Sequence, residues 1–202
     1  PNHREEATAA DLTLAELLSA VEPVEARGAL ERVLERSPDH EEALEYLIAL
    51  EQQDGDIDAA LPLYKRLLFS ARSPGRTRQA GLSLARHALE RHDPDEARIF
   101  LQVVLEAAPH DVDAQIALAE VEKAAGEPRR GAKVLEGALR ALHPSDGHAL
   151  VRIVRLLAEL SLGPLAELGR VRRVLWRAVD AEGLGDAEAT ELARLAARYA
   201  TS

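Results

Sequence analysis

The sequence contains no cysteine and no methionine among its 202 residues, and only 3% of them are aromatic. Without cysteine there is no disulfide, no thiolate metal site and no thiol catalysis. The absence of cysteine fits the cytoplasm and a bacterial envelope equally, so the compartment stays open. Without methionine, we expect the sequence to begin at a processed or internal position, and a targeting signal ahead of it is not excluded.

Long hydrophobic runs are also missing. No apolar stretch approaches the roughly 18–20 residues of a membrane-spanning helix, so no membrane span is expected. Hydrophobic residues nevertheless make up 47% of the chain and charged residues 30%, which is enough for a core and a polar surface. Alanine, leucine, arginine and glutamate dominate, and these are strong helix formers. The composition therefore predicts an all-α chain.

Charge is distributed unevenly along the chain. The formal net charge is −10, and residues 1–56 carry 15 acidic against 4 basic residues. An acidic chain repels phosphate backbones, so nucleic-acid binding is not expected. Only the stretch from Arg152 to Arg177 is basic, and it is either a site for an anionic partner or a solvated helix face.

Two series of motifs recur with a period of about 35 residues. Prolines at positions 38, 74, 109 and 144 each follow a helical pattern and precede polar residues. Between them lie EPVEA (22–26), DIDAA (56–60), DPDEA (93–97) and EPRRG (127–131). Proline at a first helical position loses no hydrogen bond, and the acid before it faces the positive helix end. The two series predict repeated units of two helices.

The second motif also sets a register for apolar residues. Counted from its small residue, apolar side chains follow at i+4 and i+7, which is one face of a helix. These positions hold Leu30, Val33, Tyr64, Leu67, Leu101, Val104, Leu135 and Ala138. We expect the small residue to let the two helices of a unit approach closely.

These residues resemble the tetratricopeptide repeat family, with Leu84, Ala85, Ala97, Leu101 and Pro109 at family spacing in the best-matching unit. The resemblance implies a single α-α superhelix over residues 1–202, with about five helical hairpins and a C-terminal capping helix. The predicted units are 7–40, 41–74, 78–111, 112–146 and 147–180, and the capping helix is 186–200. The family's aromatic residues are missing, which leaves other α-helical hairpin repeats open.

Two groups of residues invite a chemical interpretation. GEPRRGAKV (126–134) has the glycine spacing of a phosphate-binding loop, but its lysine is displaced and Val134 replaces the required hydroxyl residue. We interpret it as a repeat boundary with Gly131 at the close-approach position. The loop HPSDGH (143–148) contains histidine and aspartate, but such loops are usually turns and caps. We therefore predict no metal, no cofactor, no catalytic residues and no enzyme activity.

The family resemblance implies a concave groove lined by the first helix of each hairpin. The predicted groove residues, which would bind a peptide or amphipathic helix of a partner protein, are Glu45, Gln52, Gln79, Leu82, Arg86, Asp113, Ile116, Glu120, Val151 and Arg155. The basic carboxylate clamp of the family's chaperone-binding members is absent, because Glu45, Tyr46 and Ala49 occupy part of it.

A protein–protein adaptor is the first functional hypothesis. The alternative is a self-assembling structural module, or a regulatory domain of a larger bacterial protein. A homodimer would use the apolar residues Leu165, Leu168, Val171, Leu175 and Trp176, which also suit packing against the last helix.

Overall fold

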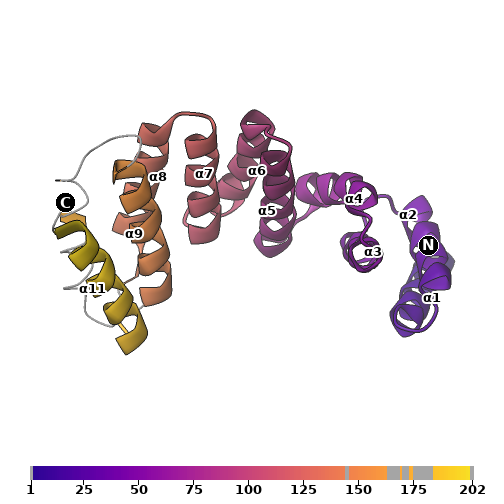
Figure 1. Cartoon of the computed structure of the whole chain (residues 1–202). Coiled ribbons are helices and arrows are strands. Elements are labelled where there is room, and N and C mark those ends of the chain that lie inside the picture. The colour runs from indigo at the N-terminus through magenta and orange to yellow at the C-terminus, as the bar shows by residue number, and fades with distance from the viewer. Residues whose placement is uncertain (1, 144–145, 163–168, 170–172, 175–183, 201–202) are drawn as a thin grey trace. The chain divides into compact units, whose positions relative to one another are not determined.

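Every regular element in the described part of the chain is an α-helix (Figure 1). The structure is a computed structural model that describes residues 2–143, 146–162, 169, 173–174 and 184–200. Its helices are α1 (Asn2–Leu18), α2 (Pro23–Arg36), α3 (Glu41–Asp54), α4 (Ile57–Ser70), α5 (Pro74–Glu90), α6 (Pro94–Ala107), α7 (Val112–Ala124), α8 (Pro128–Ala141), α9 (Gly147–Leu162) and α11 (Asp186–Ala200). The predicted all-α array of helical hairpins is confirmed.

The chain divides into two compact units, Pro1–Leu84 and Ala85–Ser202. In the first unit α1 packs on α2, α2 on α3 and α3 on α4. In the second, α6 packs on α7, α7 on α8, α8 on α9 and α9 on α11. The prediction of one domain over 1–202 stays a prediction. The apolar residues between 165 and 176 that were predicted for self-assembly lie outside the described residues.

The second helix of each described hairpin begins where the recurring motif predicts. Helices α2, α6 and α8 begin at the prolines of EPVEA, DPDEA and EPRRG, and α4 begins at the isoleucine of DIDAA. The Asp56 side chain accepts a hydrogen bond from the Ala59 backbone N–H at 2.9 Å, and Asp93 caps α6 in the same way. Such caps satisfy a backbone donor that has no partner within the helix. The motif is therefore a helix start.

Helix α5 differs from its prediction, because it begins at Pro74 rather than near residue 78. Proline is tolerated in a first helical turn, where its missing N–H has no intrahelical partner. The Thr77 hydroxyl and the Thr77 backbone N–H both donate to the Ser73 carbonyl oxygen, at 3.2 and 3.1 Å. This proline therefore ends one unit and also starts the next helix.

The first helices of three hairpins end in a left-handed residue. Gly55 and Gly126 have φ angles of 75° and 77°, and this backbone conformation is nearly free of steric cost only for glycine. The position of Gly126 confirms that GEPRRGAKV is a boundary between two helices. His92, directly before the α6 cap, occupies the same conformation with φ 59°. A β-carbon in that conformation costs about 1–2 kcal/mol.

The substitution His92→Gly is expected to raise the free energy of unfolding by about 0.5–1 kcal/mol. The change removes the left-handed penalty, and the greater chain entropy of unfolded glycine offsets part of that gain. Denaturant unfolding followed by circular dichroism measures it. A control at Arg91, which precedes the strained position, is Arg91→Gly and should destabilise the chain. Equal losses in both variants would contradict the assignment of strain to residue 92.

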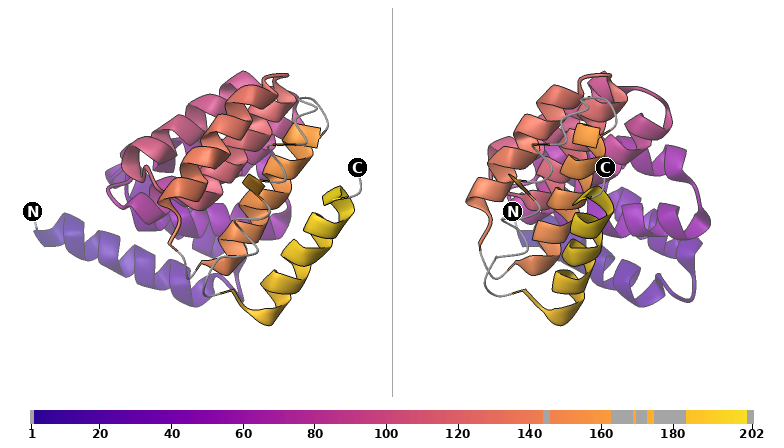
Figure 2. Two further views of the ribbon diagram at one scale, coloured as in Figure 1. Left: turned by 90° about the vertical axis from the view of Figure 1, so that its left-hand side faces the viewer. Right: turned by 60° about the vertical axis from the view of Figure 1, so that its left-hand side comes forward.

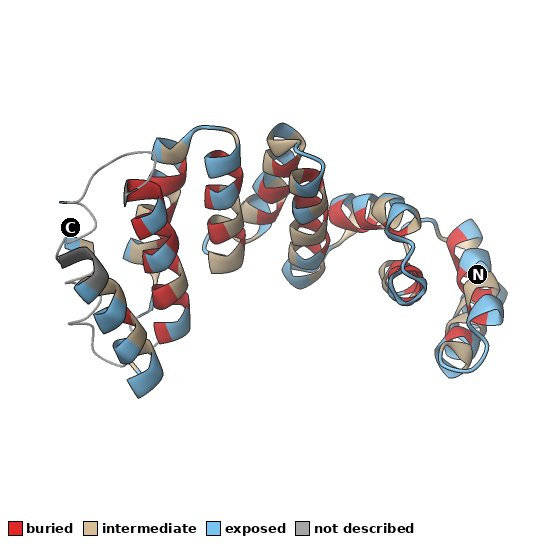
Figure 3. Cartoon of the chain, in the orientation of Figure 1, coloured by how far each residue is buried: buried red, intermediate tan, exposed pale blue. Residues whose placement is uncertain are grey.

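Buried residues form a stripe along the helices from α2 to α9, and exposed residues lie on the other side (Figure 3). In the second unit the stripes of α7, α8 and α9 meet in one cluster that includes Leu135, Ile153, Leu157 and Leu160. Helix α11 lies alongside α9 (Figure 2). Its Leu192 is fully buried against α9. The predicted C-terminal capping helix is thus confirmed.

At Gly131, helix α8 comes into close contact with α7 and α9. A β-carbon placed on Gly131 would lie 2.8 Å from the Ala119 carbonyl oxygen and 3.3 Å from Leu160 Cδ1. The sequence prediction that residue 131 must be small is confirmed, and the reason is contact between α8 and the α7 backbone. Glycine at this site therefore allows close packing of α8 against α7.

Candidate protein-binding surface

The predicted groove residues of the first unit lie on α3 and α5 and keep some exposure. Gln52 and Gln79 are exposed, whereas Glu45 and Leu82 are half-buried. Glu45 is not a free carboxylate, because its Oε2 lies 3.0 Å from Arg76 Nη2.

In the second unit the predicted residues fall into two groups. Arg86 on α5 and Glu120 on α7 are exposed, and neither makes an ion pair within the described residues. Asp113 pairs with Arg152, and Arg155 pairs with Glu191 of α11. The charges of this second group are therefore partly neutralised within the unit.

Two apolar residues of the predicted groove are buried in the core instead of lining open surface. Ile116 is 6% exposed and lies in the cluster formed by α7, α8 and α9. Val151 is 4% exposed and packs beneath α11 with Leu192. Helical periodicity alone places both on the first-helix face. Packing of the neighbouring helix then decides how much of that face remains open.

Acidic side chains from α1 and α3 lie near Tyr46, which belongs to α3. The negative charge of Glu16 is the largest cause that raises the pKa of the Tyr46 phenol, followed by partial desolvation and the charges of Glu42 and Glu45. Glu16 and Glu42 are exposed and make no ion pair within the described residues. Sequence reasoning missed Glu16, because only the pairing of α1 with α3 brings it to Tyr46.

The substitution Glu16→Gln is expected to lower the pKa of Tyr46 toward its ordinary value near 10. A phenolate beside a carboxylate is electrostatically disfavoured, so removing that charge makes ionisation easier. Titration by NMR with labelled tyrosine distinguishes Tyr46 from the other tyrosines. The control Glu31→Gln, on the exposed face of α2, should leave this pKa unchanged. A Tyr46 pKa that does not respond to Glu16 would contradict the acidic cluster.

One arginine–glutamate bridge occurs twice in equivalent places. Arg27 on α2 donates two hydrogen bonds to Glu51 on α3, at 3.0 and 3.2 Å. Arg98 on α6 donates two to Glu122 on α7, at 2.8 and 3.3 Å. In each case the acceptor follows the donor by 24 residues. Each bridge therefore joins the second helix of one hairpin to the first helix of the next.

These bridges explain an irregularity in the sequence. Glu122 stands at a position that is usually apolar in repeats of this kind, and its side chain is only 7% exposed. The two hydrogen bonds to Glu122, and then the one to Asp95, raise the pKa of the Arg98 guanidinium above its ordinary value. A buried carboxylate is tolerated when a guanidinium binds both of its oxygens. The bridge is structural.

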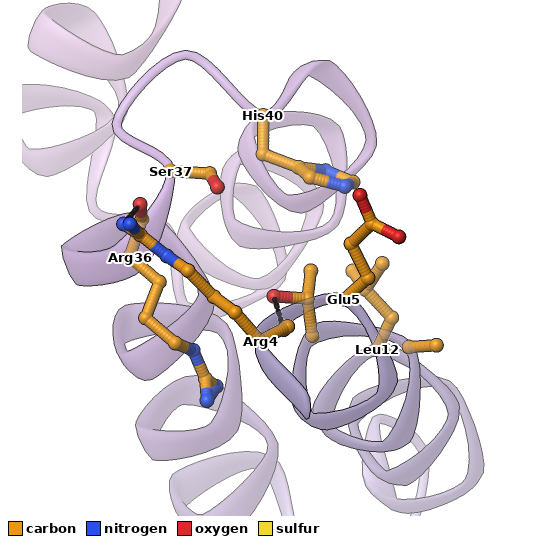
Figure 4. A pocket seen from close by; sticks show the side chains of 8 residues that line it. Arg4, Glu5, Leu12, Arg36, Ser37 and His40 are labelled. Carbon is orange, nitrogen blue, oxygen red and sulfur yellow. Dashed lines mark hydrogen bonds between the residues drawn. The ribbon is translucent and has the colours of Figure 1, made fainter. Parts of the chain in front are cut away.

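A surface pocket of about 590 Å³ lies where α1 meets the end of α2 (Figure 4). Its lining includes Arg4, Arg36 and His40. Arg4 donates to the Arg36 carbonyl oxygen, and the Arg36 guanidinium pairs with Asp11. The His40 Nδ1 accepts from the Ala43 backbone N–H at 3.4 Å and caps α3. The two arginines therefore join α1 to α2, and His40 caps α3.

The described residues contain neither a cluster of metal ligands nor a membrane-spanning helix. Within those residues, no group of three or more histidine, aspartate or glutamate side chains is placed to hold a metal ion. Two residues of the HPSDGH loop, 144 and 145, lie outside them, so that loop is only partly covered. Asp146 accepts a hydrogen bond from the Ala149 backbone N–H at 3.2 Å and caps α9. None of the described helices combines the length and apolar character needed to cross a membrane.

Sequence comparison matches most of the chain to known repeat models. A tetratricopeptide repeat model matches residues 52–121 and 88–160, and a second tetratricopeptide repeat model matches residues 17–76. A cellulose synthase operon protein C of Xanthomonas axonopodis pv. citri is 29% identical over 151 residues, which cover 70% of this chain. The matched part spans 10% of that relative's length.

Solved structures with the same fold have low sequence identity. YrrB, described as a TPR protein with an unusual peptide-binding site, is 16% identical with a TM-score of 0.59, covering 91% of this chain and 90% of its own. The MamA protein is 17% identical with a TM-score of 0.59, covering 88% and 97%. The Pseudomonas aeruginosa pilF structure is 20% identical with a TM-score of 0.56, covering 98% and 91%. At these identities the likeness concerns the fold alone.

Proposed function

This chain belongs to the tetratricopeptide repeat family, and we propose that it binds a positively charged segment of another protein on the first helices of its first unit. Proteins of this family are generally protein–protein interaction scaffolds and not enzymes. The YrrB relative has a peptide-binding site of its own. These points support a binding role, and the surface charge of this chain supports the choice of partner.

The observation that carries the proposal is the acidic surface around Tyr46. Glu16 and Glu42 are exposed carboxylates without ion pairs in the described chain, and they lie close enough to raise the pKa of the phenol. Tyr46 itself is half-buried, so part of this aromatic residue remains exposed near the carboxylates. A lysine or arginine side chain is attracted both by carboxylates and by an aromatic ring. Gln52 on α3 and Gln79 on α5 are exposed and supply hydrogen-bonding groups on the first helices of two hairpins.

The experiment compares two variants that change the net charge equally. The double substitution Glu16→Lys and Glu42→Lys reverses the proposed surface, and Glu31→Lys with Glu35→Lys reverses two exposed positions on α2. Binding is measured by calorimetry with an amphipathic lysine-rich peptide and, in parallel, by affinity capture from the native cell. We expect the first variant to lose at least about tenfold in affinity, which corresponds to about 1.4 kcal/mol, and the second to retain it.

Rising salt should weaken binding of the unaltered chain, because exposed charge pairs are screened. An equal loss in both variants would show general attraction to an acidic protein and contradict the specific surface. Retention in both would contradict the proposal entirely. In the second unit, Arg86→Glu tests whether its exposed first-helix surface also contributes to partner binding.

The self-assembly alternative stays a prediction with a separate test. Light scattering over a range of concentrations distinguishes a monomer from an associating chain. A monomer at every concentration would contradict the alternative, whereas reversible association would support it.

A further inference from the structure

The first helix of the chain exposes leucines at positions that are buried in every later hairpin for which they are described. Equivalent positions in different hairpins can be found by counting back from the N-cap residue of the second helix. These N-cap residues are Glu22, Asp56, Asp93 and Glu127. The fifth residue before each cap is Leu17, Glu51, Ala88 or Glu122. Leu17 is 70% exposed, whereas the other three are 8%, 1% and 5% exposed.

The position eight residues before each cap shows the same contrast. Leu14 is 41% exposed, and its counterparts Ile48, Ala85 and Ala119 are 3%, 2% and 0% exposed. The exposed pair on α1 is apolar in both places. A terminal helix that faces only water normally carries polar residues on this face, as terminal repeats of solenoids do. Exposed leucines at these two positions indicate a surface that another element covers.

Two interfaces between hairpins show which residue packs on the fifth position before the cap. Glu51 and Glu122 are covered by the second helix of the preceding hairpin, through Arg27 and Arg98. Each arginine is the fifth residue after its own cap. Where the first helix carries glutamate, the preceding helix therefore supplies arginine. Because Leu17 is apolar, the preceding second helix must carry an apolar residue at the position equivalent to Arg27 and Arg98.

We propose that the Leu14–Leu17 face of α1 is a docking surface for a further helical hairpin, joined ahead of residue 1 in the polypeptide, whose second helix presents an apolar residue five positions after its cap. The interface continues the one that Arg27 and Glu51 form inside the first unit. The cellulose synthase operon protein C relative shows that a segment similar to this chain occurs within a longer protein, because the matched part is only 10% of its length.

A hairpin of the required chemistry exists within the chain itself. Leu61 on α4 is the fifth residue after the Asp56 cap. The hairpin of α3 and α4 therefore has an apolar side chain at the position equivalent to Arg27 and Arg98. Helices α1 and α5 also have equal lengths, 17 residues each. Joining a copy of residues 41–73 to His3 therefore reproduces ahead of α1 the register with which α4 precedes α5.

The test measures thermal unfolding of the 202-residue chain and of this fusion, each with and without Leu17→Glu. We expect the fusion to raise the unfolding midpoint of the first unit by at least about 4 °C. Leu17→Glu should shift the midpoint of the unfused chain by less than about 2 °C, because the residue is exposed there. In the fusion the same change should abolish the gain, because it buries an unpaired carboxylate.

A charge pair serves as the matched control. Changing Leu61 to arginine in the added copy, together with Leu17→Glu, recreates the bridge of Arg27 and Glu51 and should restore at least half of the gain. Failure of the fusion to stabilise, or an equal effect of Leu17→Glu in both backgrounds, would overturn the proposal. It would also be overturned if the unfused chain were a dimer that Leu17→Glu converts to a monomer, because a second copy would then cover the face.

Discussion

Replacing Arg98 with leucine is expected to lower the free energy of unfolding of the second unit by about 2–3 kcal/mol. The substitution leaves the Glu122 carboxylate 7% exposed and without the guanidinium that now binds both of its oxygens. An uncompensated buried charge costs about 3–5 kcal/mol when it is fully buried. The arginine side chain is 21% exposed, so water reaches the site and the expected loss is smaller.

Two further variants show that burial of the carboxylate is the cause. Arg130→Leu breaks a pair with Glu127 at 4.0 Å between side chains that are 66% and 51% exposed, and surface pairs of this kind contribute about 0–1 kcal/mol. The double variant Arg98→Leu with Glu122→Leu should recover most of the loss, since an apolar pair replaces the bridge. Denaturant unfolding followed by circular dichroism measures all three. Equal small losses for Arg98→Leu and Arg130→Leu would contradict a structural role of the bridge.

Replacing Gly131 with valine is expected to cost about 2–3 kcal/mol of unfolding free energy in the same unit. The new β-carbon would lie 2.8 Å from the Ala119 carbonyl oxygen, which belongs to the backbone of α7 and cannot rotate away. Glycine is a poor helix former, and its removal from α8 returns less than about 1 kcal/mol. The steric cost is therefore larger than the propensity gain, and the net effect is destabilising.

The control for Gly131 lies on the same helix. A β-carbon on Gly137 meets nothing within 4 Å. Gly137→Ala should therefore stabilise the unit by about 0.5–1 kcal/mol, because only the propensity of α8 changes. The two glycines are predicted to respond with opposite signs in the same unfolding experiment. A stabilising effect of valine at residue 131 would mean that α7 and α8 are not in contact there.

Short-range chemistry explains why most of the helix starts were predictable. Proline after an acid, aspartate at a cap and glycine in a left-handed turn act within a few residues, so each leaves a local signal. The boundary at residues 126–134 was identified in this way. The start of α5 was misplaced because Pro74 was interpreted only as a stop signal.

The surface was harder to predict than the helices. Ile116 and Val151 share a helical face with exposed residues, but α8 and α9 cover the first of them and α11 covers the second. The bridge from Arg98 to Glu122 links residues 24 positions apart on different helices, and no rule of helix periodicity pairs them. Whether the open groove residues touch a partner stays a prediction.

The sequence by itself determined the helix type, the hairpin period and the small-residue positions, because propensity, capping and apolar periodicity are properties of neighbouring residues. Only the tertiary structure decided which first-helix side chains remain open and which are paired. Glu16 reaches Tyr46 only because α1 and α3 belong to the same unit. Burial and charge pairing depend on residues of other helices, and their free energy arises from contacts that exist only after the hairpins have packed.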